Sequence, residues 1–120
     1  DNPYKIMRIH EKFHPDVIER DKPGSLRNFK NYANSGSKYA NPGHVFDYMH
    51  KLNDFKNPWV RHIIYEWVHP FADGNGRSGR IMLAADTDFD FDKIMDFIDD
   101  KYVSRIVNFV ESHANMNDLF

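Results

Sequence analysis

The 120-residue chain contains no cysteine, no long hydrophobic run and little excess charge of either sign. The lack of cysteine excludes a disulfide scaffold, a cysteine-ligated zinc site and thiol catalysis. No apolar run approaches the roughly 18 residues of a membrane span, and no hydrophobic region of a signal peptide opens the chain. The formal net charge of −2 is not that of a general nucleic-acid or anionic-membrane binder. We therefore expect no nucleic acid and no membrane among its partners.

What is present is the composition of one folded domain. Hydrophobic residues make up 41%, charged residues 28% and aromatic residues 15% of the sequence, which excludes a disordered tail or a coiled coil. A chain of this length has room for one core, so we predict a single domain over residues 1–120. Because the chain begins at Asp1 rather than at methionine, we expect it to be a fragment of a longer protein. The absence of cysteine fits a reducing compartment, so we expect a cytoplasmic location.

The spacing of apolar residues predicts a mainly α-helical bundle. Apolar residues recur at intervals of three and four, as on one face of a helix, and prolines and glycines separate the runs. The run after Asn57-Pro58 is hydrophobic nearly all round, so we predict that it forms the central buried helix and ends at His69-Pro70. The predicted helices span about residues 3–18, 43–55, 58–68, 76–85, 91–98 and 102–110.

A small β-hairpin is predicted between the first two helices. Residues 26–40 read as two short extended runs, with Phe29 and Tyr32 on one and Tyr39 on the other. Residues 34–37, Asn-Ser-Gly-Ser, are typical of a turn between them. Such a hairpin would have free edges and a weak apolar face, so it is either an ordinary surface hairpin or a docking surface.

One stretch, residues 69–80 with the sequence HPFADGNGRSGR, has the residue types of phosphate chemistry. Glycines open a helix after a tight loop, and a helix N-terminus offers unpaired amide donors that a phosphate can approach closely. Arg77 and Arg80 lie one helical turn apart and can bind further phosphate oxygens. Asp73 is a hard ligand suited to magnesium, and His69 can accept a proton near neutral pH. The stretch therefore predicts a site for a magnesium-bound triphosphate with a general base beside it.

Each of these residues also has a plainer interpretation. The two arginines could form surface ion pairs, the histidine could be a satisfied helix-terminal residue, and Asp73 could cap the following helix. The glycines match the dinucleotide-binding pattern G-x-G-x-x-G, but a helix rather than a strand precedes them, which argues against that site. One phosphate site accounts for all of the residues together, and we favour it.

The string HPFxDGNGRxxR resembles the signature of the Fic (filamentation induced by cyclic AMP) domain family, and every specified position is present. The resemblance extends to His62, Tyr65 and Glu66 before the motif and to residues 24–27, Gly-Ser-Leu-Arg, which would open the family's flap. It implies a Fic-type helical bundle with the hairpin as a flap over the active site. It also implies protein AMPylation, in which AMP passes from ATP to a Tyr, Thr or Ser hydroxyl of a target protein and pyrophosphate is released.

The resemblance implies a role for each position of the motif. His69 would be the general base that deprotonates the target hydroxyl, Asp73 would hold Mg²⁺ against the phosphates of ATP, and Phe71 would fix the loop. Arg77 would bind the phosphates of the leaving group, and Arg80 would help to place the γ-phosphate. The nest around the phosphates would be formed by Gly74, Asn75 and Gly76.

The flap implied by the resemblance is where a target protein would add an extended strand through main-chain hydrogen bonds. Tyr102, on the last predicted helix, is the residue implied for the adenine side of the site. The residues implied for target docking are Phe29, Asn31, Tyr32, Lys38 and Tyr39.

Members of the family differ in chemistry. Kinase-like members carry Lys where this chain has Gly76 and Asn where it has Asp73, and phosphocholine-transferring relatives alter the middle of the motif. The form present here is that of AMP transfer, so transfer from another phosphate-containing donor is disfavoured. A catalytically quiet module that binds nucleotide or a partner remains an alternative.

Many Fic proteins restrain themselves with an inhibitory helix that carries the motif Ser/Thr-x-x-x-Glu. No serine or threonine of this chain is followed by glutamate four positions later. Restraint would therefore come from a separate antitoxin-like protein or from sequence outside the chain, unless the domain is an unrestrained toxin or effector that acts in a host cytoplasm. The missing glutamate also argues against the reverse reaction, removal of AMP from a modified protein.

Overall fold

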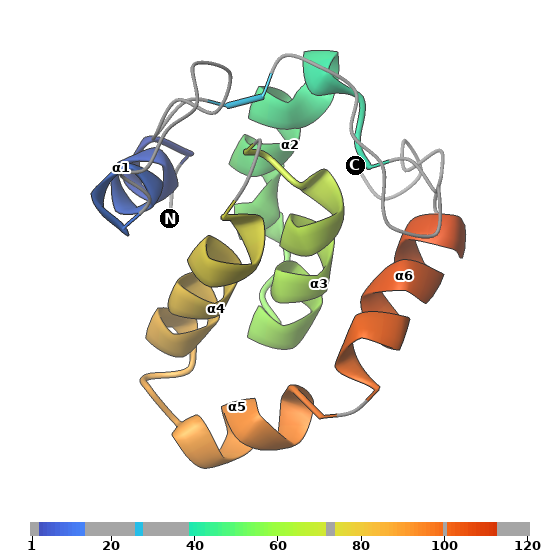
Figure 1. Cartoon of the computed structure of the whole chain (residues 1–120). Coiled ribbons are helices and arrows are strands. Elements are labelled where there is room, and N and C mark those ends of the chain that lie inside the picture. Colours follow the sequence, from blue (N-terminus) through green and yellow to red (C-terminus); the bar gives the residue numbers. More distant parts are fainter. Residues whose placement is uncertain (1–2, 14–25, 28–38, 72–73, 100, 113–120) are drawn as a thin grey trace.

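The computed structural model describes residues 3–13, 26–27, 39–71, 74–99 and 101–112, and their regular secondary structure is helical (Figure 1). No helix in this part of the chain is both long enough and apolar enough to cross a membrane. The elements are α1 (Pro3–Phe13), the 3₁₀ turn η1 (Pro42–His44), α2 (Val45–Lys51), the 3₁₀ turn η2 (Leu52–Asp54), α3 (Pro58–Val68), α4 (Asn75–Asp86), α5 (Phe91–Phe97) and α6 (Tyr102–Ser112).

The predicted mainly α-helical class is confirmed, with differences at two places. The helix expected over residues 43–55 is α-helical only over Val45–Lys51, because the 3₁₀ turns η1 and η2 flank a short α2. At η2 the amide of Phe55 donates to the carbonyl of Leu52 at 3.1 Å, the tight bond that commonly ends an α-helix. Residues 14–18 of the first predicted helix and most of the predicted hairpin lie outside the described residues, and residues 26–27 and 39–40 carry no strand.

Helix α3 is the central element, as its sequence predicts. The side chain of Asn57 caps it by accepting the amides of Trp59 and Val60 at 2.9 and 3.4 Å, and Pro58 occupies the first helical position. The helix packs against α2, α4 and α6, which surround it in Figure 1. It ends at His69, which adopts a left-handed conformation.

The core is assembled from α1, α2, η2, α3 and α4, from residue 40 and from the loop that follows α3. Helix α1 contributes Ile6, and α4 contributes Met82. The loop residue Phe71 has no exposed surface, so this part of the connection between α3 and α4 belongs to the core. The remaining core side chains, from residue 40, α2, η2 and α3, are Ala40, Val45, Tyr48, Met49, Leu52, Ile64, Tyr65, Trp67 and Val68.

Helices α3 and α4 approach closely at Gly79. A Cβ atom at this position would lie 2.1 Å from Oε1 of Glu66 and 3.1 Å from the ring of Tyr65, so only glycine fits the contact. Beside it, the hydroxyl of Tyr65 hydrogen-bonds Oγ of Ser78, and Ser78 in turn donates to the carbonyl of Asn75 at 3.1 Å. The first turns of α4 are thereby fixed on α3.

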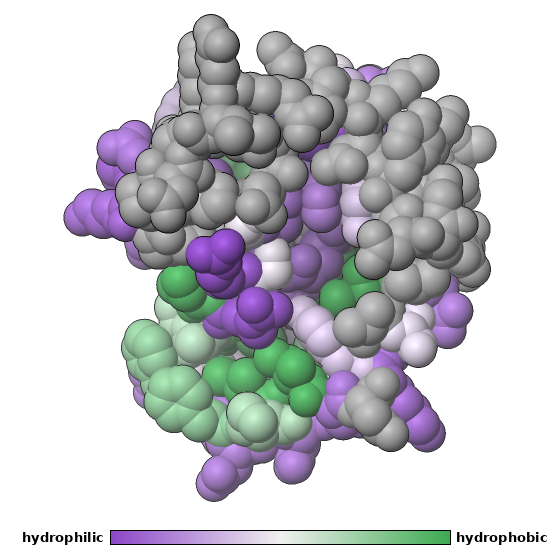
Figure 2. Space-filling view, in the orientation of Figure 1, coloured by the Kyte–Doolittle hydropathy of each residue, from purple (hydrophilic) through white to green (hydrophobic). Residues whose placement is uncertain are grey.

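Apolar side chains are exposed at the corner between α4 and α5. Figure 2 shows this apolar area below the polar surface of α4. It includes Ile81 on α4, Phe89 in the turn, and Phe91 and Met95 on α5. Helix α5 begins where the side chain of Asp90 accepts the amide of Lys93 at 3.2 Å.

Candidate active site

The loop from α3 to α4 is held from both sides. The ring of Phe71 stacks on that of His10 from α1, with centroids 3.8 Å apart and planes 5° apart. The side-chain amide of Asn75 spans the backbone of Phe71: its Oδ1 accepts the Phe71 amide at 2.8 Å and its Nδ2 donates to the Phe71 carbonyl at 2.9 Å. The start of α4 is therefore tied to the residue two positions beyond His69.

His69 stands at the C-terminal end of α3 in a conformation that a non-glycine residue rarely adopts, with φ 50° and ψ 59°. Its amide donates to the carbonyl of Tyr65 at 3.0 Å, and its own carbonyl accepts Nε of Arg27 at 2.5 Å. The ring of Tyr39 lies flat on the imidazole, with centroids 3.8 Å apart and planes 2° apart. The imidazole thus has a fixed backbone and one covered face.

Helix α4 opens at Gly74, which is also left-handed, with φ 79°. The first helical bond runs from the amide of Ser78 to the carbonyl of Gly74 at 3.0 Å, so the amides of residues 75–77 have no partner within the helix. Glycine at position 76 leaves room for Arg80, whose Nη1 would lie 3.1 Å from a Cβ atom there. The N-terminal turn of α4 has the geometry of an anion site.

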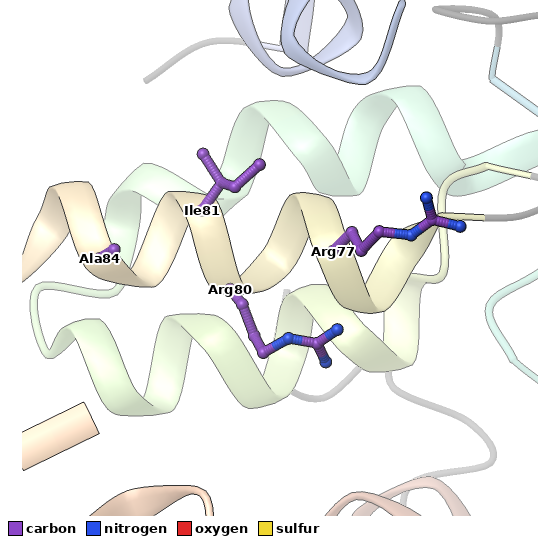
Figure 3. Close-up of a pocket in the computed structure, with 4 residues that line it drawn as sticks. All are labelled: Arg77, Arg80, Ile81 and Ala84. Atoms are coloured by element: carbon purple, nitrogen blue, oxygen red, sulfur yellow. The ribbon is translucent and has the colours of Figure 1, made fainter. Parts of the chain in front are cut away.

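Two arginines of α4 line an open pocket of about 390 Å³ together with Ile81 and Ala84 (Figure 3). In Figure 3 the side chains of Arg77 and Arg80 both extend toward the N-terminal end of the helix, where the loop from α3 arrives. The N-terminal half of α4 therefore presents two guanidinium groups beside the first-turn amides.

A buried polar cluster lies behind Arg80. His62 of α3 bonds the carbonyl of Gly79 through Nδ1 at 3.1 Å and the hydroxyl of Tyr102 through Nε2. Burial lowers the pKa of His62 to about 4, so the ring is neutral, with its proton on Nδ1 and Nε2 accepting from the tyrosine. Burial raises the pKa of Tyr102, as the charge of Glu66 also does, whereas the interaction of its hydroxyl with Arg80 opposes the rise.

Glu66 is the unusual member of this cluster. Its Oε1 is buried without a hydrogen bond to any described residue and lies 3.7 Å from Nε2 of His62. Burial raises the pKa of the carboxyl to about 8, although Arg80 opposes the rise. The group therefore holds a proton at neutral pH.

The sequence matches a model of the Fic/DOC family over residues 2–85, more than half of the chain. The chain belongs to the Fic/DOC family. A comparison with curated proteins found no significant match.

The structure of this Fic/DOC chain brings together most of the motif residues predicted from the sequence. The described members of the motif lie around the α3–α4 loop. The side-chain amide of Asn75 bonds the loop backbone at Phe71 rather than pointing into the pocket. Outside the described residues lie the predicted metal ligand and four docking residues: Asp73, Phe29, Asn31, Tyr32 and Lys38.

Two predicted residues occupy places that sequence reasoning did not foresee. Tyr39, expected in the target-docking flap, stacks on His69, and Tyr102, expected on the adenine side, is bonded to His62 beside Arg80. Those two predicted roles stay predictions. Among the described residues no group of three His, Asp or Glu side chains forms a metal site.

Sequence reasoning missed the functional supports of this Fic/DOC site. Arg27 and Glu66 belong only to the family resemblance, and no role was predicted for His10. Glu66 did carry a signal, because it is the acidic residue of a helix whose neighbours are almost all apolar. A carboxyl in such a helix is either paired or holds a raised pKa.

Proposed function

We propose that this Fic/DOC chain is a protein adenylyltransferase, which transfers AMP from magnesium-bound ATP to a Tyr, Thr or Ser hydroxyl of a target protein. Membership of the family supports a Fic-type activity. The observation that carries the proposal is the closure of the α3–α4 loop by Asn75, because it holds an imidazole and the N-terminus of a helix suited to anions within one short turn.

The proposed reaction is a substitution at the α-phosphorus of ATP. The oxygen of the target hydroxyl forms a bond to the α-phosphorus of ATP, and His69 accepts the hydroxyl proton. The bond between the α-phosphorus and the oxygen that bridges it to the β-phosphorus breaks. Pyrophosphate leaves with the electron pair of that bond. The amides of the first turn of α4 and the guanidinium groups of Arg77 and Arg80 would stabilise the charge on the phosphates.

The cofactor and partners belong to the same proposal. The carboxylate of Asp73 is a hard oxygen ligand of the kind that Mg²⁺ prefers, and bound Mg²⁺ would neutralise phosphate charge. A target protein would dock at the flap of residues 29–39, and a separate small antitoxin-like protein would supply the restraint for which the sequence has no motif. The reaction would take place in the cytoplasm of the producing cell or of a host cell.

The position of the transferred label tests the proposed function. The chain is incubated with a cell lysate and with ATP labelled on either the α- or the γ-phosphate. We expect covalent label on protein from the α-phosphate and none from the γ-phosphate, because pyrophosphate leaves. Label from the γ-phosphate would indicate a kinase instead, and nucleotide binding without label from either position would indicate the quiet module.

The variant Arg80→Ala tests whether Arg80 contacts the phosphates of ATP that lie beyond the α-phosphate. We expect the affinity for magnesium-bound ATP to fall about 10- to 100-fold and that for AMP to change little, because a charge-assisted hydrogen bond beyond the α-phosphate is worth about 1.5–3 kcal/mol. Titration calorimetry measures both affinities. Arg105→Ala is the matched control, since this exposed arginine pairs with Asp99 at 3.1 Å. Equal losses for ATP and AMP would contradict the placement of Arg80.

A further inference from the structure

Two residues far from the motif in sequence meet at the same turn, the left-handed residue His69. Arg27 precedes it by 42 positions and is 4% exposed. Tyr39 stacks on its ring, and the amide of the next residue, Ala40, donates to the carbonyl of Trp67 at 3.3 Å. Both ends of the segment from residue 27 to residue 39 are therefore attached to the C-terminal end of α3.

Arg27 satisfies the backbone groups that the end of α3 leaves open. Its Nε donates to the carbonyl of His69 at 2.5 Å, and its Nη2 donates to the carbonyl of Val68 at 3.0 Å and also to that of Ala40. Its backbone amide donates to the carbonyl of Pro70 at 2.8 Å. Three consecutive carbonyls, at 68, 69 and 70, thus accept hydrogen bonds from one residue, which is an unusually complete helix C-cap.

The burial of this arginine is unfavourable in itself. Burial lowers the pKa of Arg27 to about 10, so the buried guanidinium is still charged at neutral pH. What it stabilises is a backbone conformation that a β-carbon disfavours, and such conformations persist only where the surroundings impose them. The contacts of Arg27 supply that restraint at His69.

Tyr39 acts on the side chain rather than on the backbone. Its ring is parallel to the imidazole within 2°, so the plane of the His69 ring cannot rotate without losing the contact. Burial raises the pKa of the Tyr39 phenol, with a further contribution from Glu66, and Arg27 opposes the rise. The phenol of Tyr39 is therefore uncharged at neutral pH, and its ring covers one face of the His69 imidazole.

We propose that Arg27 and Tyr39 are positioning residues for His69, the first holding its backbone turn and the second holding the plane of its imidazole. The consequence for catalysis rests on the proposed function, in which that imidazole accepts the proton of the target hydroxyl. A base that rotates out of line loses rate without losing nucleotide affinity, because ATP binds at α4 and not at this ring.

The positioning of His69 by Tyr39 can be tested by spectroscopy, without an assay of enzymatic activity. In the full chain with ¹³C-labelled histidine, the Hε1 resonance of His69 is assigned by its disappearance in His69→Ala. A stacked aromatic ring shifts this resonance upfield from those of exposed histidines. We expect Tyr39→Phe to keep the upfield position, Tyr39→Leu to lose it, and Tyr4→Leu, a change at an exposed tyrosine of α1, to have no effect. An unmoved resonance in Tyr39→Leu would overturn the proposal.

The second test measures transfer of labelled AMP. Tyr39→Leu is expected to lower kcat about 10- to 100-fold with little change in KM for ATP, and Tyr39→Phe to restore most of the rate. Arg27→Lys keeps the charge but lacks the planar guanidinium that bonds the carbonyls of Val68, His69 and Ala40 together, so we expect a similar loss. Equal losses in Tyr39→Phe and Tyr39→Leu would overturn the proposal. If the unaltered chain transfers no label, the proposed function fails. The resonance of His69 then still tests whether Tyr39 positions the imidazole.

Discussion

Near pH 9, Glu66→Gln is expected to be more stable than the unaltered chain, by up to about 5 kcal/mol in the free energy of unfolding. Near pH 4 the two are expected to be almost equally stable. The difference arises because the carboxyl of Glu66 is buried in α3, where burial raises its pKa to about 8. The amide of glutamine has nearly the same shape and no charge.

The direction follows from proton binding. In the unfolded chain Glu66 has the ordinary pKa of 4.5, and in the folded chain it keeps its proton up to about pH 8. Between these values the folded state binds more protons, so the stability of the unaltered chain falls as the pH rises through that window. Each unit by which the two pKa values differ is worth about 1.4 kcal/mol, and the figure of 5 kcal/mol is an upper limit because relaxation near Arg80 would reduce it.

Urea denaturation of both proteins at a series of pH values measures this difference. The expected result is a gap in unfolding free energy that opens from about pH 5 and levels off above about pH 8. Glu11→Gln, a change at an exposed carboxyl of α1, is the matched control and should follow the unaltered chain at every pH. Parallel curves for Glu66→Gln and the unaltered chain would show that the carboxyl is ionised in the fold.

The sequence was sufficient for elements whose limits depend on local chemistry. Helix α3 was predicted from Asn57-Pro58 to His69-Pro70, and the structure caps it at Asn57 and ends it at His69. The helix expected over residues 43–55 is α-helical only in its middle, because apolar residues three apart fit an α-helix and a 3₁₀ turn equally well. Packing around Leu52 determines which of these two helix types is formed, and the spacing of apolar residues carries no information about that packing.

The motif was predictable for a similar reason, since its residues are neighbours along one turn and the start of one helix. Its supports were not, because they come from distant segments: Arg27 lies 42 positions before His69, and Tyr102 lies 40 positions after His62. Asn75 is a third case, because its side chain bonds the backbone of Phe71 only four positions away. The sequence of the motif does not distinguish such a loop contact from a contact to a phosphate.

Replacement of His69 is expected to have the largest effect on the proposed reaction. We expect His69→Ala and His69→Asn to lower the rate of AMP transfer about 10²- to 10⁴-fold, the contribution of a well-placed general base. Asparagine is the sharper variant, because it tolerates the left-handed conformation of residue 69 and accepts no proton near neutral pH. A loss in His69→Asn therefore reports on the base and not on the turn.

Initial rates with α-labelled ATP measure this loss, and calorimetry measures nucleotide affinity in the same variants. The affinity for ATP should stay within about twofold, because in the proposed reaction the imidazole would act on the target hydroxyl and the phosphates would bind at α4. His50→Ala is the matched control, since this exposed histidine of α2 contacts the rings of Tyr4 and Phe46. Transfer that survives in His69→Asn at the unaltered rate would assign the proton to another group, and loss of ATP affinity would place the imidazole on the nucleotide instead.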